Sequence, residues 1–372
     1  MARQSRPCST ICRQKWHNCY YGVTEMYNNS KDVLAYHNEK VTLTQDERTE
    51  MRKRRDANRD RLKKRLKDTG KPTPHEFIKQ GSYAMLTMVQ DADKDYDIDD
   101  GVYFTKGSLK KSDGTDMLPR EAKEMAQDVL RDDRFNKQPK VKKSCVRIFY
   151  EEGYHVDMPI YRIRESDGKY ELASDDGWTV SRAADTEDWF NETNKEKSPD
   201  VGSNGGQFRR CVRLMKKFAR SRREWKKDIA AGFTITKLVE EHFIADVARE
   251  DVALRDCMQR IYDRLLISLE VQHPVTQGAM LTSGSDDSGT RLLRDNLKDA
   301  LEELKVLDNL NCTAIQATKA WDRVFNTDFF SIRQTAVEKA ATAEHNTKAL
   351  EGLIASKMDP RLTEKRGGGR FA

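Results

Sequence analysis

Six aspartates crowd residues 91–100 (DADKDYDIDD). Side chains alternate along a β-strand, so Asp95, Asp97 and Asp99 would share one face of a strand there, while Ile98 would face the interior. Like charges at this spacing repel one another unless a cation neutralises them. Carboxylate oxygens suit Mg²⁺, which typically takes one or two carboxylates plus substrate phosphates. The pattern therefore predicts a Mg²⁺ site on a strand, and a solvated acidic turn is the alternative.

A further aspartate, Asp157, stands alone in the alternating segment 154–161 (YHVDMPIY). Its neighbours Val156 and Met158 would lie on the core face of a strand, so Asp157 would lie on the opposite face. By itself it has the pattern of a surface carboxylate. Beside the aspartate pair of a neighbouring strand it would complete a two-metal site, which stabilises the attacking and the leaving oxygen of an in-line displacement.

Gly81 and Ser82 precede the acidic run at a predicted strand-to-helix turn. A glycine lets backbone N–H groups approach a phosphate, and the serine hydroxyl adds another donor. The dipeptide alone fits a plain turn equally well. The chain contains no G-x-x-x-x-G-K-[ST] motif and no G-x-G-x-x-G motif after a strand, which excludes P-loop and Rossmann sites.

Cys8, Cys12, His17 and Cys19 lie close together near the N-terminus. Their side chains are of the types that bind zinc, but the spacing matches no familiar structural zinc site. Cysteines placed by chance on an N-terminal segment are the alternative.

The elements that must position these residues begin with a long helix. The segment 44–47 (TQDE) predicts a capping box that opens a helix running to about Asp68. Residues 77–163 mix strand and helix patterns, and 191–206 has the composition of a linker. Helices are expected after that linker at 207–226, 234–271, 290–305, 312–327 and 334–357.

The chain of 372 residues is polar, with 37% hydrophobic residues and a net charge of +6. Basic residues concentrate in 51–68 and 207–227, which predicts a phosphate-rich partner, either nucleic acid or nucleotide; solvated helix faces are the alternative. Seven scattered cysteines form no disulfide framework, as expected in a reducing cytoplasm. No apolar run suits a membrane span or a secretory signal, so we expect a cytoplasmic protein without a membrane partner.

Taken in order, a Gly-Ser turn, an Asp-Ile-Asp strand and a lone aspartate on a later strand resemble the polymerase-β-like nucleotidyltransferases. Within them the chain is similar to the bacterial cGAS/DncV-like enzymes, and most of all to the DncV-type cyclic GMP-AMP synthases. The resemblance covers roughly residues 16–240 and weakens in the C-terminal third. The matching segments are KQGSYAML (79–86), DYDIDDGVYF (95–104), YHVDMPIYR (154–162), EDWFNET (187–193) and RLMKKF (213–218).

This resemblance implies an α+β fold in which a mixed nucleotidyltransferase sheet, with a long N-terminal helix, packs against a C-terminal helical domain. The implied divisions are an N-terminal segment (1–42), the nucleotidyltransferase core (43–205), the helical domain (206–360) and a flexible Gly-rich tail (361–372).

It also implies roles for individual residues. Asp97, Asp99 and Asp157 would bind two Mg²⁺ ions, with Mn²⁺ as a substitute. The donor triphosphate would be held by Gly81, Ser82 and Lys216. Thr234 would take the place of a family serine, and Arg147 would lie near the nucleotides, with a surface arginine as the alternative. Many family members carry an aromatic residue three positions after the serine, where this chain has Met85, so the choice of base stays open.

The implied activity joins nucleoside triphosphates, with ATP and GTP expected, into a cGAMP-like cyclic di- or oligonucleotide for anti-phage (CBASS) signalling, and releases pyrophosphate. In part of the family a ubiquitin-like conjugation machinery acts on the C-terminus, and the tail RGGGRFA (366–372) would suit it. The zinc insert of animal relatives is missing from the expected region, so activation by nucleic acid is not implied.

Two other functions stay open. A related nucleotidyltransferase could add nucleotides to RNA or protein, and its basic helix would then follow a polymer backbone. The chain could instead be a non-catalytic module that binds RNA or a partner. The clustered aspartates and the Gly-Ser turn argue against that module, because a relict site has no reason to keep repelling charges.

Overall fold

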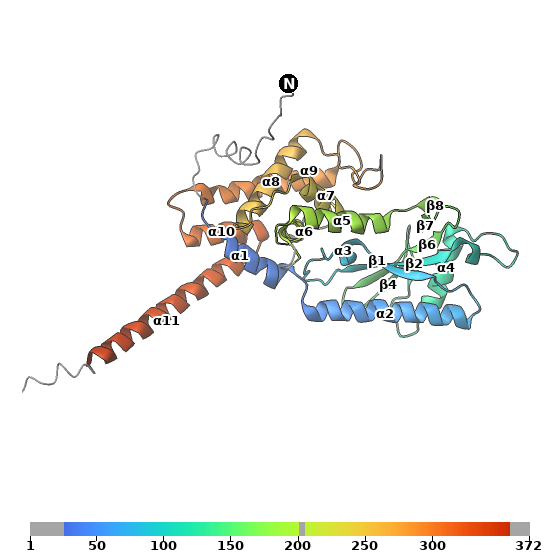
Figure 1. The fold of residues 1–372 in the computed structure, drawn as a ribbon, viewed down its shortest axis with the longest axis horizontal. Helices are drawn as coiled ribbons and strands as arrows, with labels where there is room; N and C mark the ends of the chain where they lie inside the picture. The colour runs from blue at the N-terminus through green and yellow to red at the C-terminus, as the bar shows by residue number, and fades with distance from the viewer. Residues whose placement is uncertain (1–25, 201–204, 358–372) are drawn as a thin grey trace, which may run out of the picture. The chain divides into compact units, whose positions relative to one another are not determined.

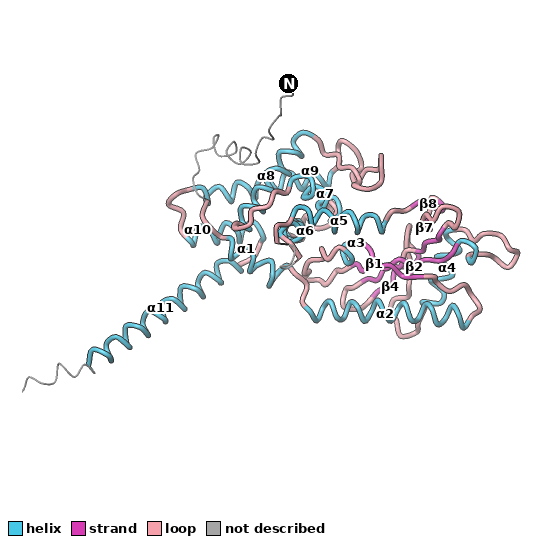
Figure 2. Tube along the Cα trace, in the orientation of Figure 1, coloured by secondary structure: helices cyan, strands magenta, loops and turns pink. Residues whose placement is uncertain are grey.

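The structure, a computed structural model, describes residues 26–200 and 205–357. These residues form two compact units: the larger spans Asn28–Glu302, and the smaller combines Met26 and Tyr27 with residues 303–357. Strands occur in one part of the larger unit, and helices make up most of the remaining regular structure (Figure 2). Among the described residues, no helix combines the length and the apolar character needed to cross a bilayer.

One mixed sheet of eight strands is built around β2 (Asp97–Thr105). On one edge of β2 lies the antiparallel β1 (Glu76–Gln80). On the other edge, β5 (His155–Met158) and β6 (Ile160–Ile163) pair in parallel with β2. The outer strands are β3 (Lys140–Val141), β4 (Val146–Phe149), β7 (Tyr170–Ser174) and β8 (Gly177–Val180). This sheet and its flanking helices confirm the predicted α+β fold.

Two helices, α2 (Gln45–Asp68) and α4 (Pro119–Leu130), cover one face of the sheet, and α5 (Ala183–Lys197) lies on its other side (Figure 1). The Thr44 hydroxyl accepts a hydrogen bond from the Glu47 backbone N–H, and the Glu47 carboxylate accepts one from the Thr44 N–H. The predicted capping box is therefore present. The core beneath α2 and α4 is made of side chains that are fully buried, among them Leu62, Ile98, Val102, Phe104 and Val146.

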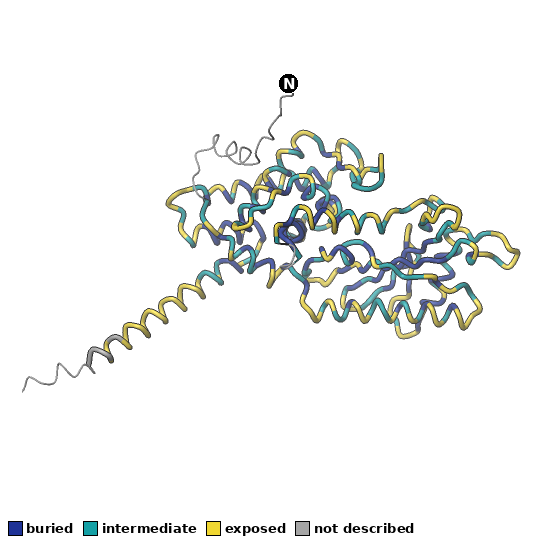
Figure 3. The backbone as a smooth tube through the Cα atoms, in the orientation of Figure 1, coloured by how far each residue is buried: buried dark blue, intermediate teal, exposed yellow. Residues whose placement is uncertain are grey.

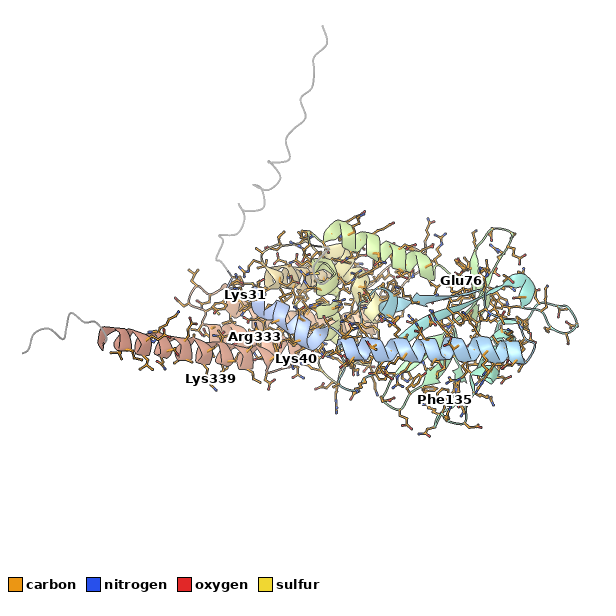
Figure 4. The ribbon with its side chains drawn as sticks, turned by 60° about the horizontal axis from the view of Figure 1, so that its bottom comes forward. Lys31, Lys40, Glu76, Phe135, Arg333 and Lys339 are labelled. Atoms are coloured by element: carbon orange, nitrogen blue, oxygen red, sulfur yellow. The ribbon has the colours of Figure 1, made fainter. Side chains whose placement is uncertain are left out.

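Basic residues of α2 pack this helix onto the sheet domain. Arg59 donates two hydrogen bonds to the buried Asp100 carboxylate of β2. The guanidinium of Arg61 lies over the ring of Phe135, 4.7 Å from its centroid, on the side of the molecule that faces the viewer in Figure 4. Some basic side chains of 51–68 thus bind the helix to the sheet domain, and this weakens the interpretation of 51–68 as a phosphate-binding surface.

The helical part of the larger unit is centred on α6 (Gln207–Ala219), whose residues are nearly all buried (Figure 3). The predicted single helix 234–271 is wrong, because the chain breaks between α7 (Gly232–His242) and α8 (Glu250–Ile267). The Gln207 side chain donates a hydrogen bond to the backbone C=O of Asp246 and accepts one from its N–H. These two bonds stabilise the non-helical segment between α7 and α8.

The helix α5 (Ala183–Lys197) also differs from expectation, since its last residues were predicted to be linker. Its buried Phe190 packs against Phe208 of α6, and this contact extends the helix into the polar stretch. The remaining elements of the larger unit are α1 (Ser30–Tyr36), the π-helix η2 (His37–Val41), α3 (Gly81–Ala84), the 3₁₀ turn η3 (Lys106–Ser108) and all but the last two residues of α9 (Ser288–Leu304).

The smaller unit has an aromatic core formed by the near-parallel rings of Trp321, Phe325 and Phe330. Beyond this core its last helix is exposed, as the yellow trace of α11 shows (Figure 3). Its elements are the 3₁₀ turn η4 (Lys305–Asp308), α10 (Ala314–Phe325) and α11 (Phe329–Lys357).

Candidate active site

Five of the eight predicted site residues line one cavity in the larger unit. The cavity has a volume of about 790 Å³, which lies within the range of small-molecule sites. Its walls come from the turn after β1, the start of β2, α6 and the start of α7. The predicted residues in its lining are Gly81, Ser82, Asp97, Asp99 and Lys216.

The carboxylates meet because of strand register. Asp97 and Asp99 lie opposite His155 and Asp157, respectively, across the parallel pairing of β2 with β5. Burial, reinforced by the charges of Asp157 and Asp97, raises the pKa of Asp99 to about 7. Burial also raises the pKa of Asp97. A nearby cation would favour the ionised form of both groups, so the pair is electrostatically suited to a divalent ion.

The third predicted carboxylate, Asp157, is held by an arginine. On β4, Arg147 lies directly opposite Asp157 and donates two hydrogen bonds to its carboxylate, at 2.8 and 2.7 Å. The same guanidinium lies 3.3 Å from Asp97 Oδ1, and the hydrogen bond to Asp157 raises the pKa of Arg147. Within the described ranges, no group of three or more His, Cys, Asp or Glu side chains is arranged to hold a metal ion.

Gly81 sits against the carboxylate of Asp99, so a side chain at this position would require that carboxylate to move. A Cβ atom at Gly81 would lie 2.3 Å from Asp99 Oδ2, and the backbone φ of +61° belongs to the left-handed region. Glycine adopts this conformation without the steric cost that other residues meet. The turn that carries Ser82 can therefore approach the Asp97–Asp99 pair closely.

Lys216 brings a buried amine to the same cavity. Its Nζ donates a hydrogen bond of 2.8 Å to the Thr87 hydroxyl. Burial, together with the positive charges of Arg220 and Arg213, lowers the pKa of Lys216 to about 7. An anion bound next to this amine would restore its charged form, which is the behaviour expected of a phosphate ligand.

The three other predicted site residues, Thr234, Asp157 and Arg147, do not belong to the described lining of the cavity. Thr234 is buried, and the described lining of the cavity includes its neighbours Phe233 and Ile235 but not Thr234 itself. Asp157 and Arg147 lie behind Asp97 and Asp99 rather than in that lining. The cysteine and histidine cluster at residues 8–19 and the Gly-rich tail fall outside the described residues.

Sequence reasoning missed two groups at the cavity. Lys226, which lines the cavity, lies 2.8 Å from Asp91 Oδ2 and 3.4 Å from Asp93 Oδ2, so these two aspartates bind a lysine instead of extending the strand. The opposite charges of the two segments were the available signal. Phe233 and His273 also line the cavity, and no pattern in the sequence marks them.

Comparison with known proteins agrees with this geometry. Residues 75–161 match the family model described as "Cyclic GMP-AMP synthase DncV-like, nucleotidyltransferase domain". The cyclic GMP-AMP synthase of Escherichia albertii is 28% identical over 222 residues, which cover 56% of this chain and 46% of that protein. The match thus spans about half the length of that relative.

Solved structures share the fold. The structure of Escherichia coli CdnC with ATP superposes with a TM-score of 0.59 at 18% identity, over 81% of this chain and 98% of that one. The cyclic AMP-GMP synthase DncV of Vibrio cholerae has a TM-score of 0.64 at 17% identity, over 80% and 96% of the two chains. A complex of the Vibrio enzyme with the linear intermediate pppApG has a TM-score of 0.63 at 17% identity, over 77% and 92%. At these identities the likeness establishes the fold.

Proposed function

We propose that this chain, a nucleotidyltransferase whose residues 75–161 form a DncV-like catalytic domain, joins nucleoside triphosphates into a cyclic, cGAMP-like dinucleotide and releases pyrophosphate. One observation carries the proposal. A pair of carboxylates of raised pKa, Asp97 and Asp99, faces a glycine turn and a buried lysine across a single cavity. Anionic and cationic groups converge there as binding of a metal–triphosphate complex requires.

The donor set fits a hard divalent cation. Asp97 and Asp99 would hold it, and phosphate oxygens of the substrate would complete its shell, as is typical of Mg²⁺. Such an ion, when bound, neutralises charge on the triphosphate and lowers the pKa of an attacking hydroxyl. Asp157 could join the pair only after its contact with Arg147 opens, and the released guanidinium would then be available to a nucleotide phosphate.

The chain's own residues would do the positioning. The Ser82 hydroxyl and the Gly81 backbone would orient the donor triphosphate, and Lys216 would balance its charge. A 3′- or 2′-hydroxyl of the acceptor then attacks the α-phosphorus, the bond to the β-phosphate oxygen breaks, and pyrophosphate leaves. The same displacement on the linear intermediate closes the ring. Orientation and fixed charges of this kind supply most of the acceleration in phosphoryl transfer.

The test is synthesis from labelled ATP, GTP, CTP and UTP with Mg²⁺, followed by phosphatase. The double variant Asp97→Asn with Asp99→Asn, which changes no core contact, is the matched control. A phosphatase-resistant product made only by the wild-type chain supports the proposal, and leaving out one triphosphate at a time identifies the bases. Labelled RNA or protein in place of a small product would establish the alternative nucleotidyltransferase instead.

The wider setting follows from the same family. We expect the product to act as a signal in anti-phage defence in the bacterial cytoplasm. The Gly-rich segment 366–372 stays a predicted target of a ubiquitin-like conjugation machinery. Deleting 367–372 should leave synthesis intact and abolish conjugation, and conjugates formed by the shortened chain would contradict this prediction.

A further inference from the structure

Two rings that the nucleotidyltransferase motifs do not include stand in the wall of the cavity. Phe233, at the start of α7, and His273, after α8, both line it and are both half-buried. Their ring centroids are 5.4 Å apart at 57°, and Trp189 of α5 meets Phe233 edge-on at 6.1 Å and 83°. Neither neighbour lies parallel to the Phe233 ring, so neither is stacked on it. Aromatic faces in such cavities stack nucleobases.

Phe233 is also close to the group that would bind the triphosphate. Its chain neighbour Gly232 packs on the stem of Lys216, where an added Cβ would lie 3.4 Å from Cε and 3.8 Å from Nζ. Phe233 is therefore the residue next to the one that contacts the Lys216 side chain. A nucleotide whose phosphates lie at Lys216 would have its base within reach of this wall.

The imidazole of His273 has a fixed tautomer. Its Nδ1 lies 3.2 Å from the backbone nitrogen of Val275 and 3.1 Å from that of Thr276, and accepts from both N–H groups. Burial lowers the pKa of His273, so the ring is neutral at physiological pH and carries its proton on Nε2. His273 thus brings to the lining a ring whose N–H donor is on Nε2, and nucleobases present ring-nitrogen and carbonyl acceptors on their edges.

We infer that Phe233 and His273 form the base subsite of this cavity. The Phe233 ring stacks on a nucleobase, and the His273 Nε2–H donates to an acceptor on the edge of that base. The pair supplies the aromatic surface that Met85, an aliphatic residue of the same lining, does not. This inference rests on the proposed function only in taking a nucleoside triphosphate as the ligand.

Binding measurements separate base from phosphate recognition. Non-hydrolysable ATP and GTP analogues and inorganic tripolyphosphate are titrated with Mg²⁺ into the full chain, by calorimetry. Phe233→Leu should weaken nucleotide binding by about tenfold and leave tripolyphosphate binding unchanged. His273→Asn keeps an acceptor for the two backbone N–H groups and removes the Nε2–H donor, so it should change the ATP-to-GTP affinity ratio by about fivefold or more.

Phe77→Leu is the matched control, because Phe77 is a half-buried aromatic of β1 that does not belong to the described lining. Equal losses for tripolyphosphate and nucleotide in the Phe233 variant, or no loss for either, would overturn the base subsite. An unchanged ATP-to-GTP ratio in the His273 variant would overturn the hydrogen bond. Base-dependent binding by a chain that forms no cyclic product would refute the proposed synthesis and still support the subsite.

Discussion

Replacing Asp99 by asparagine should stabilise the metal-free protein, although Asp99 is a central residue of the site. Its pKa is raised from the usual 3.8 to about 7, mainly by burial and then by Asp157 and Asp97. The native state therefore keeps a proton that the unfolded chain loses above pH 3.8, and stability falls as the pH rises from about 4 to 7. Asparagine carries no charge, so Asp99→Asn escapes this loss.

The magnitude follows from the pKa. A pKa shift of one unit corresponds to about 1.4 kcal/mol. The full shift of Asp99 would therefore lower the free energy of unfolding of the wild type by about 4 kcal/mol above pH 7. Asp99 is half-buried, and water screens part of this effect, so we expect a gain of about 1–2 kcal/mol at pH 8. For a domain of this size each kcal/mol raises the melting temperature by roughly 2–4 °C.

The assay is thermal unfolding in EDTA at pH 8 and at pH 5, followed by tryptophan fluorescence. The gain should shrink by more than half at pH 5, and Mg²⁺ should stabilise the wild type more than the variant. Asp100→Asn is the control, because Asp100 is the next residue on β2, is fully buried and accepts two hydrogen bonds from Arg59. Breaking that pair should cost about 3 kcal/mol or more. A lower melting temperature for Asp99→Asn at pH 8, or a gain that is equal at both pH values, would refute the reasoning.

Three further predictions concern the same cavity. Gly81→Ala should reduce product formation by about 100-fold, because its Cβ would collide with the Asp99 carboxylate and displace the turn; wild-type rates from this variant would contradict the geometry. Since Lys216 has a pKa of about 7, binding of a non-hydrolysable triphosphate should weaken roughly tenfold between pH 6 and 8 in the Asp99→Asn background, where Asp99 no longer titrates over the same range. Adding Lys216→Met to that background should remove most of the pH dependence, and calorimetry at both pH values checks it. Arg147→Met should lower the melting temperature in EDTA and enlarge the rise caused by Mg²⁺, because Asp157 loses its counter-ion; a higher melting temperature in EDTA would exclude this.

The parts of the site that sequence reasoning reached are those controlled by local alternation. A period of two places Asp97 and Asp99 on one face of β2, with Ile98 and Val102 in the core, and the structure has this arrangement. The pattern is sufficient because a strand that is buried on one side leaves its register little freedom.

The parts it missed depend on contacts distant in sequence. The opposite charges of residues 91–93 and 207–227 are visible in the sequence, but they do not identify Lys226 as the partner of Asp91 and Asp93, since that pairing forms only after the helical part packs on the sheet domain. The orientation of α7 is similar. Neighbouring residues on a helix point about 100° apart, so the way α7 docks on α6 decides that Phe233 and not Thr234 meets the cavity.

The contact between Gly81 and Asp99 also limits how this protein can evolve. With the Cβ of any other residue at 81 only 2.3 Å from Asp99 Oδ2, a change at 81 is tolerated only if the β2 carboxylate moves or disappears, and its disappearance would remove the proposed cation ligand. Substitutions at 81 and at 99 are therefore epistatic, because the residue at each position limits which residues are tolerated at the other. In a lineage that lost the enzyme's activity, displacement of the Asp99 carboxylate would no longer be harmful, so a larger residue at 81 could appear there before the aspartates themselves had changed.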